Sequence, residues 1–458
     1  MQLLRVQLSS RQSLSVVSIL WFSLVAAAAW VIAMPSLRSE FGLSFTIGLL
    51  TIFVAAIIAT FSLRYMRSDS RSARFFLTLS ALVASVLTLL FTNNILVLGA
   101  AWCFSGWLLA GVIGHSKSWA EAHAAARRTR ATFFLGDTAL LAALALLGWH
   151  AGSLQLDGVL ASAVTLPASV KSVVALLLVV TAATRCAQPP FVGWLLSSMT
   201  APTPVSALMH AGLVNAGGFL LIRFAPLLEA APFARTVAVV VGLCGAIYGI
   251  GIMMVRPDVK RSLAGSTVSQ MGFMIMSCGL GAYAAALWHI IAHGLFKAWL
   301  FLGSGSMIGM KTGRGETPLS GRMTLGIATG TVGVAICILS FGEGDASLVP
   351  LLLAMATAFT TLIASLEGKA QVRAKLLLLL VALIAFHSVG VLLAGLVIDK
   401  DASPLVPEWV HLVLLVVFLG AWTWQQQRFS TGRGLPMRLY VHLINAGALP
   451  ATGNGEEK

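Results

Sequence analysis

Apolar runs about as long as a membrane-spanning helix follow one another along almost the whole chain, and this feature constrains the fold most. A helix that crosses a bilayer needs roughly 20 predominantly apolar residues. Fourteen stretches meet that requirement, near residues 12–34, 43–63, 75–92, 94–113, 131–150, 172–198, 205–226, 236–255, 262–280, 283–309, 323–341, 347–366, 376–397 and 409–427. The sequence therefore predicts an all-α fold, a polytopic transmembrane helix bundle of about 14 helices.

The composition excludes a soluble globular protein. Charged residues make up 10% of the chain, against about 25% in a typical soluble domain. The 43 glycines suit helices that pack closely in lipid, and no segment alternates in the way that a membrane β-barrel requires. We expect residues 1–427 to form one transmembrane bundle and residues 428–458 to form a basic cytoplasmic tail.

The formal net charge of +14 would suit a nucleic-acid-binding protein if the charges formed one face, so their distribution decides. With the N-terminus in the cytoplasm, 23 of the 30 Lys and Arg residues fall in cytoplasmic segments and five in external ones, which leaves Arg185 and Lys297 inside helices. This bias follows the positive-inside rule. It predicts a multi-pass protein of the cell inner (cytoplasmic) membrane with both termini in the cytoplasm, and no nucleic-acid partner.

Neither the first apolar run nor the cysteines change this interpretation. The run is too long for the apolar part of a secretory signal, and residues 34–36 make a poor cleavage site, so we expect a first membrane span. The five cysteines are isolated inside apolar stretches and form no C-x-x-C motif: Cys103, Cys186, Cys244, Cys278 and Cys337. We expect neither a disulfide framework nor a metal site.

Polar residues inside the apolar runs are few, and they are informative because a charge at membrane depth is costly. The tenth run contains His289, His293 and Lys297, whose spacing of four places them on one helix face over two turns. Imidazole titrates near neutral pH, so such a row can carry protons. The alternative is two structural histidines and a lysine that extends to an interface. Lys297 lies near the middle of the run, which favours the proton path.

Two adjacent prolines, Pro189 and Pro190, interrupt the sixth run beside Arg185. An unbroken helix cannot contain both, because each lacks the amide donor and crowds the preceding turn. Broken helices at membrane depth occur at the ion sites of transporters. The sequence predicts a broken helix with an arginine at its edge, and the alternative is an interfacial arginine whose helix simply ends there.

Three further polar residues lie inside the runs. A lone histidine in an apolar run is more often a core residue with its hydrogen bonds satisfied than a relay. His210, however, follows the broken helix, and Ser206 lies one turn before His210 on the same face, which together favour a place in an ion path. Asp137 lies two turns from Arg128 and Arg130. A structural ion pair between Asp137 and these arginines is therefore an alternative to a role in transport.

Two blocks of sequence resemble a known family. They are residues 201–212, APTPVSALMHAG, and residues 259–272, VKRSLAGSTVSQMG. With His289, His293 and Lys297 after them, these blocks resemble the antiporter-like subunits of respiratory complex I and of multi-subunit cation/proton antiporters, over roughly residues 95–310. The resemblance implies two inverted five-helix repeats, each with a broken helix, and a central chain of Lys, His and Glu residues that moves protons. It places Arg185 where the family has a lysine, and it places the central chain at His210, His289, His293 and Lys297.

The chain also departs from that family. The segment 99–107, GAAWCFSGW, lacks the glutamate of the pumping members, and the run 347–366 contains neither a lysine nor a glutamate for the second broken helix. An arginine at position 185 cannot itself release a proton. Within the family, residues 194–228 resemble the DabB subunits, the membrane components of the DAB inorganic-carbon accumulation system.

This resemblance implies a partner and a role. DabB subunits pair with DabA, a large zinc-binding protein that resembles a β-type carbonic anhydrase. A flow of protons or sodium ions through the membrane subunit would energise hydration of carbon dioxide or uptake of bicarbonate by that partner. The chain itself would be no enzyme and would hold no zinc, quinone or nucleotide cofactor. Arg185 would ease deprotonation of Lys297 through its fixed positive charge, and the tail would dock on the partner or lie on the lipid bilayer.

Two other functions remain as alternatives. One is a proton-pumping antiporter-like subunit of a complex I-type NADH:quinone oxidoreductase, and the other is a subunit of a multi-subunit cation/proton antiporter. The absence of the glutamate from residues 99–107 and of a lysine from residues 347–366 weighs against both.

Overall fold

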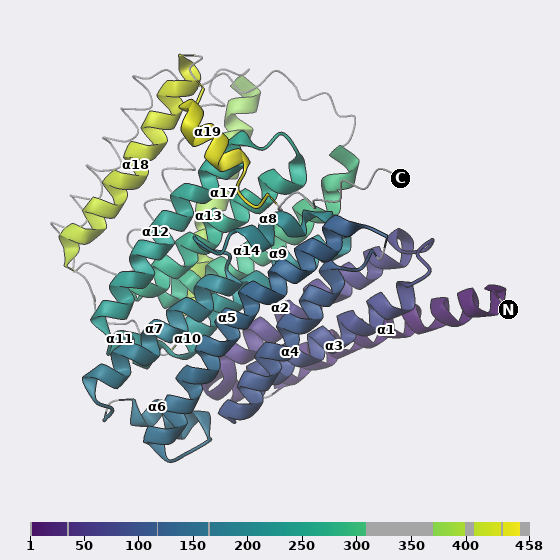
Figure 1. Cartoon of the computed structure of the whole chain (residues 1–458), viewed down its shortest axis with the longest axis horizontal. Helices are drawn as coiled ribbons and strands as arrows, with labels where there is room; N and C mark the ends of the chain where they lie inside the picture. The colour runs from purple at the N-terminus through teal and green to yellow at the C-terminus, as the bar shows by residue number, and fades with distance from the viewer. Residues whose placement is uncertain are drawn as a thin grey trace, which may run out of the picture.

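The computed structural model describes residues 2–33, 36–116, 118–163, 165–307, 370–398, 407–431 and 434–448. These residues form long helices that lie side by side in a bundle, with α1 (Gln2–Ala33) at one edge and α18 (Glu408–Ser430) at the opposite edge (Figure 1). Among the described residues, nine helices are long and apolar enough to cross a membrane. The all-α polytopic fold predicted from the sequence is confirmed.

The first half of the chain follows the predicted runs closely. Its helices are α1, α2 (Ser36–Tyr65), α3 (Ser72–Phe91), α4 (Ile95–Ile113), α5 (Ala120–Ala151), the short α6 (Leu156–Ser162) and α7 (Ala168–Arg185). Asn94 caps α4, because its side chain accepts hydrogen bonds from the amides of Leu96 and Val97. The helix α5 begins well before the apolar run that predicts it, because its polar first turns continue the same helix beyond the apolar part.

The middle of the chain contains the broken helices. The helix α7 ends at Arg185, just before Pro189 and Pro190, as the sequence predicts. Short elements follow: α8 (Gly193–Ser197), η1 (Ser198–Thr200), α9 (Thr203–Ala211), η2 (Leu213–Asn215), α10 (Ala216–Arg223) and α11 (Ala225–Glu229).

The span predicted over 205–226 is confirmed as a candidate membrane span, Thr203–Arg223, but it is not one continuous helix, because α9 ends at Ala211. Gly212 leaves the helical conformation there, with φ −120° and ψ −71°. The side-chain amide of Asn215 donates a hydrogen bond of 2.9 Å to the carbonyl of Ala211, which satisfies one of the acceptors that the break leaves free. His210 therefore lies at the end of a helix instead of inside one.

The second half contributes α12 (Pro232–Val255), α13 (Val259–Leu280), α14 (Tyr283–Gly303), η3 (Ser304–Met307), α17 (Ala370–Gly395), α18 and α19 (Met437–Ile444). The predicted runs 323–341 and 347–366 lie outside the described residues. Of the described helices, α13 is not among the nine that suit a membrane by composition, because Lys260, Ser266, Thr267 and Gln270 interrupt its apolar residues.

The helices α12 and α13 approach each other backbone to backbone. A Cβ atom added to Gly249 would come within 2.2 Å of the amide of Ser269, and one added to Gly272 would come within 2.5 Å of the carbonyl of Gly242. A Cβ atom added to Gly265 would likewise meet the backbone of α12. Small residues permit this close packing in a membrane interior. It holds α13 firmly in position, and α13 carries one wall of the site described next.

Candidate functional site

The residues His289, His293 and Lys297 form one row on α14, as their spacing predicts. The imidazole rings of His289 and His293 stack with 5.6 Å between their centroids and 20° between their planes. His293 is buried, and Lys297 is 1% exposed, one of the largest fully buried side chains among the described residues. Lys297 therefore lies inside the bundle and does not extend toward an interface.

The row continues from α14 to α13. The ammonium group of Lys297 donates a hydrogen bond of 3.1 Å to the carbonyl of Leu263. The same carbonyl accepts a hydrogen bond of 3.0 Å from the hydroxyl of Thr267, one turn further along. Because Leu263 provides the only hydrogen-bond acceptor of Lys297 in the described part of the chain, two of the three ammonium N–H groups remain available for other partners.

Thr267 then connects this carbonyl to His210 at the end of α9. The hydroxyl oxygen of Thr267 lies 3.0 Å from Nδ1 of His210, and the ring of His210 stacks on Phe301 of α14 with 4.2 Å between centroids. Nothing in the sequence distinguishes Thr267 from other threonines in apolar runs, because buried hydroxyls most often bond within their own helix. In this chain the hydroxyl joins α13 to α9 as well.

Three imidazole nitrogens along the row have no hydrogen-bond partner within the described structure. They are the Nε2 atoms of His210, His289 and His293, all buried. Buried polar atoms in native proteins nearly always have a partner, and ordered water commonly provides it. These three nitrogens are therefore candidate positions for ordered water.

Arg185 and Asp137 form a separate buried pair between α7 and α5. One guanidinium nitrogen of Arg185 donates to Oδ1 of Asp137 at 2.9 Å and to the carbonyl of Trp102 at 2.9 Å. The guanidinium carbon lies 4.2 Å from the ring centroid of Phe133, so the cation also contacts an aromatic face. A Cβ atom added to Gly106 would come within 2.5 Å of the guanidinium, so a larger residue at this position would displace the end of the Arg185 side chain.

This pair corrects one interpretation of the sequence. Asp137 does not pair with Arg128 or Arg130, its neighbours along the chain. Arg128 instead donates hydrogen bonds to the carbonyls of Gly447 and Ala448 beyond α19. Arg185 is buried and paired, which excludes the interpretation of an interfacial arginine whose helix simply ends.

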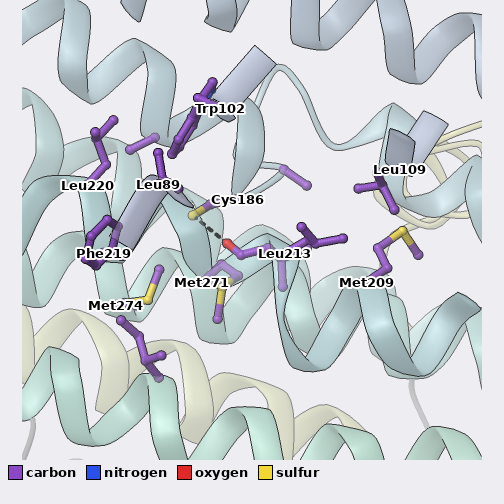
Figure 2. Close-up of a cluster of buried hydrophobic side chains, with 14 of the residues drawn as sticks. Leu89, Trp102, Leu109, Cys186, Met209, Leu213, Phe219, Leu220, Met271 and Met274 are labelled. Carbon is purple, nitrogen blue, oxygen red and sulfur yellow. Dashed lines mark hydrogen bonds between the residues drawn. The ribbon is translucent and has the colours of Figure 1, made fainter. Parts of the chain in front are cut away.

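The carbonyls freed by the break at Pro189 and Pro190 are covered by protein. The indole of Trp194 donates to the carbonyl of Thr184 at 2.8 Å, and the side-chain amide of Gln188 donates to the carbonyl of Cys186 at 2.8 Å. Figure 2 shows Cys186 among buried apolar side chains, with its thiol directed toward the carbonyl of Val214 in η2. Protein side chains therefore satisfy the carbonyls of Thr184 and Cys186 at this break.

Two residues have contacts that the sequence does not predict: Ser206 bonds within its own helix, and His387 contacts α14. The hydroxyl of Ser206 is buried and bonds only weakly to the carbonyl of Pro202 on its own helix, at 3.5 Å. His387 on α17 accepts a hydrogen bond of 3.0 Å from the indole of Trp288. It also interacts electrostatically with His289. A single histidine in an apolar run was the only sequence signal for this residue.

The described residues contain no group of three His, Cys, Asp or Glu side chains that could hold a metal ion. The polar groups brought together are instead imidazoles, a lysine and a hydroxyl that span α14, α13 and α9. These groups exchange protons and bind water. The arrangement therefore suits proton transfer more than metal chemistry.

Residues 92–384 match the sequence profile of the NADH:quinone oxidoreductase/Mrp antiporter transmembrane family. The chain belongs to this family. The resemblance noted in the sequence is thereby confirmed. The fold agrees as well: a solved Mrp complex from Dietzia sp. superimposes with a TM-score of 0.62 at 23% sequence identity, over 93% of this chain and 56% of that chain.

Relatives within the family carry two kinds of name. The chain is 40% identical over 275 residues to a probable inorganic carbon transporter subunit DabB1 of Halothiobacillus neapolitanus, covering 58% of this chain and 49% of that protein. It is 40% identical over 269 residues to a probable inorganic carbon transporter subunit DabB of Bacillus subtilis, covering 57% and 52%. It is 37% identical over 290 residues to NADH-quinone oxidoreductase subunit L of Mycobacterium tuberculosis, covering 61% and 45%. The chain spans about half the length of these relatives.

Proposed function

We propose that this chain is the proton-conducting membrane subunit of a two-component complex that accumulates inorganic carbon. Two of the relatives at 40% identity are named as probable inorganic carbon transporter subunits. The polar row inside the bundle gives such a subunit a route for protons. The names of these relatives support inorganic carbon as the substrate, and the geometry of the polar row supports protons as the transported ion.

The observation that carries the proposal is the connection of Lys297 to His210 through α13. Lys297 and Thr267 share the carbonyl of Leu263, and Thr267 contacts His210. Polar groups therefore extend from α14 to the end of α9 without a long apolar gap. An isolated buried lysine would offer no such continuation.

In the proposed path, protons enter from the external side and pass His210 and the row of His289, His293 and Lys297. They leave toward a partner on the cytoplasmic side. The unpartnered Nε2 atoms of the three histidines support a water-lined route. Lys297 acts as the relay, because two of its N–H groups are free to face water or an imidazole.

The partner would be a DabA-like large zinc-binding subunit. Proton flow through this chain would energise the hydration of carbon dioxide or the uptake of bicarbonate there. The carbonic-anhydrase-like chemistry would belong entirely to the partner, and this chain would contribute ion transport without a cofactor of its own.

Arg185 would act on the path through its charge. Its ion pair with Asp137 means that the pair, and not an isolated cation, faces the rest of the bundle. An ionised Asp137 offsets part of the positive charge of Arg185. The electrostatic effect of Arg185 on Lys297 would therefore be weaker with Asp137 ionised than with Asp137 neutral.

Co-expression in a bacterium that lacks carbonic anhydrase tests the function. This chain and the large subunit encoded beside it should together restore growth in ordinary air, and a protonophore should abolish that growth. Each chain expressed alone should fail. If both chains are present in the membrane and growth is still not restored, the carbon-accumulation proposal is rejected.

Variants of α14 test the path. Lys297→Ala should abolish carbon-dependent growth while the complex still assembles. Phe296→Ala is the matched control, since Phe296 is the adjacent residue and is 57% exposed on the outer side of the same helix. Full growth with Lys297→Ala would reject the relay, whereas loss with both variants would indicate a general defect of α14.

The second candidate is a proton-pumping subunit of an NADH:quinone oxidoreductase, or of a multi-subunit cation/proton antiporter. The 37% identity to subunit L of Mycobacterium tuberculosis favours it. A gene neighbourhood of oxidoreductase or small antiporter subunits, together with failure of the growth test, would support this candidate instead.

A further inference from the structure

A basic cavity outside the polar row opens between α3, α4 and α5. Its volume is about 560 Å³. It lies where α3 and α5 begin and α4 ends, on the face that the positive-inside rule predicts to be cytoplasmic. Four arginines line it, two from the start of α3 and two from α5: Arg71, Arg74, Arg127 and Arg130. None of these residues belongs to the proposed proton path.

The positive charge of this cavity is not compensated by the described part of the protein. No salt bridge among the described residues includes any of the four arginines. The nearby carboxylate of Asp69 interacts electrostatically with Arg71, but its two oxygens are already engaged by the Arg71 amide and by His115, each at 2.8 Å. Several like charges around one cavity favour a bound anion.

One wall of the cavity is apolar and faces outward. Leu77 and Trp107 line it and are 71% and 62% exposed, respectively. Side chains of this size on the outside of a membrane bundle lie against acyl chains, and tryptophan favours the region near the headgroups. The cavity therefore joins a cluster of cations to a surface that hydrocarbon covers.

We propose that this cavity between α3, α4 and α5 binds the phosphate group of an anionic phospholipid. Guanidinium groups bind phosphate oxygens through two parallel hydrogen bonds, so Arg127 and Arg130 would hold the headgroup with Arg71 and Arg74 opposite. The acyl chains would lie along Leu77 and Trp107. Basic pockets between membrane helices on the cytoplasmic side are known to bind such headgroups, and the apolar wall distinguishes a lipid from a soluble phosphate.

Native mass spectrometry of the detergent-purified full chain tests this assignment. Dioleoyl phosphatidylglycerol should bind, and dioleoyl phosphatidylcholine should bind much less. The double variant Arg127→Gln/Arg130→Gln should weaken phosphatidylglycerol binding by about 30-fold, because each basic side chain near an anionic lipid raises the affinity and this variant removes two of them. Both arginines are exposed, so their loss leaves the packing of the bundle intact.

The double variant Arg64→Gln/Arg67→Gln is the matched control. Arg64 and Arg67 are exposed on the same face, but they do not line the cavity. This variant removes the same charge and should leave phosphatidylglycerol binding nearly unchanged. Equal weakening by both double variants would show that only general surface charge is involved, and it would overturn the proposal.

Inorganic phosphate at millimolar concentration separates the two possible sources of the ligand. If the lipid is the ligand, phosphate should displace little of the bound phosphatidylglycerol. Complete displacement would assign the cavity to a soluble phosphate and reject the lipid. Unchanged phosphatidylglycerol binding by Arg127→Gln/Arg130→Gln would overturn the proposal, because the cavity would then not be the site that holds the lipid.

Discussion

Arg185 on α7 donates a hydrogen bond to Asp137 on α5, with 2.9 Å between Nη2 and Oδ1. The side chains are 3% and 17% exposed, so the two opposite charges meet inside the bundle. Removing one partner of a buried pair leaves the other charge uncompensated, which typically costs about 3–5 kcal/mol. We expect Asp137→Asn to lower the free energy of unfolding by about 3 kcal/mol, seen as a lower Tm of the purified protein in detergent.

Two further variants make that prediction specific. The double variant Asp137→Asn/Arg185→Gln should recover much of the lost stability, because no buried charge is left alone. Asp258→Asn breaks the exposed pair with Arg261, whose atoms are 3.9 Å apart, and it should change the stability by less than about 1 kcal/mol. Equal Tm values for Asp137→Asn and Asp258→Asn would contradict the importance of the buried pair.

Thr267→Val is expected to interrupt the path without loosening the fold. Valine has the shape of threonine, but it removes the hydroxyl that joins the Leu263 carbonyl to His210. A lost proton-transfer group typically costs at least about a hundredfold in rate, so we expect proton flux into vesicles to fall by about a hundredfold, and Thr267→Ser to restore it.

The matched control for that change is Thr181→Val. Thr181 is also buried, and its hydroxyl also bonds to backbone carbonyls, those of Gly136 and Leu177. It lies on α7, away from the row on α14. If Thr181→Val reduced proton flux as much as Thr267→Val does, the loss would reflect a buried hydroxyl in general and not a link in the path.

The parts of the site that the sequence predicts are those determined by local spacing. Steps of four along one helix align His289, His293 and Lys297 whatever the rest of the fold does. Two adjacent prolines end a helix for reasons contained in their own rings. The apolar runs likewise predict most membrane helices, since each run alone must satisfy its backbone hydrogen bonds.

The parts that the sequence does not predict depend on contacts between distant segments. Asp137 and Arg185 are separated by 48 residues, and His210 and Thr267 by 57. No local pattern distinguishes Arg185 from Arg128 as the partner of Asp137. The break after α9 was missed because Gly212 and Asn215 are compatible with a membrane helix, and only the packing of the bundle shows that they interrupt one.

Acid should weaken one contact outside the membrane spans. Asp69 lies in the turn between α2 and α3, with Oδ2 2.8 Å from Nε2 of His115. Burial acts to raise the pKa of Asp69, but hydrogen bonds from the Arg71 amide and from His115 outweigh it and hold the pKa below its ordinary value of 3.8. The folded state therefore binds this proton less readily than the unfolded chain does.

The stability that Asp69 contributes is thus present above the pKa of the unfolded carboxyl, and it is lost as the pH falls through the lower pKa of the folded state. The Tm of the wild type should exceed that of Asp69→Asn from neutral pH down to about pH 5, and the difference should shrink as the pH falls below about 4. A difference that stays constant or grows in acid would contradict the hydrogen-bonded carboxylate.

His387 on α17 is expected to extend the polar row beyond α14. It accepts the indole hydrogen of Trp288 at 3.0 Å and interacts electrostatically with His289. The contact is closely fitted, since a Cβ atom added to Gly390 would come within 2.3 Å of the indole ring. If His387 exchanges protons with the row, His387→Leu should reduce proton flux about tenfold or more. Trp288→Phe, which removes only the indole donor, should retain most of the flux.

The pair of variants separates transport from packing. A structural His387 would serve only to satisfy the indole of Trp288, and then both variants should lower the Tm while leaving flux per folded protein unchanged. A transporting His387 should instead give a loss of flux that exceeds any loss of folded protein, and only in His387→Leu. Equal proton flux in His387→Leu and the wild type would show that the polar row stops at His289 and does not include His387.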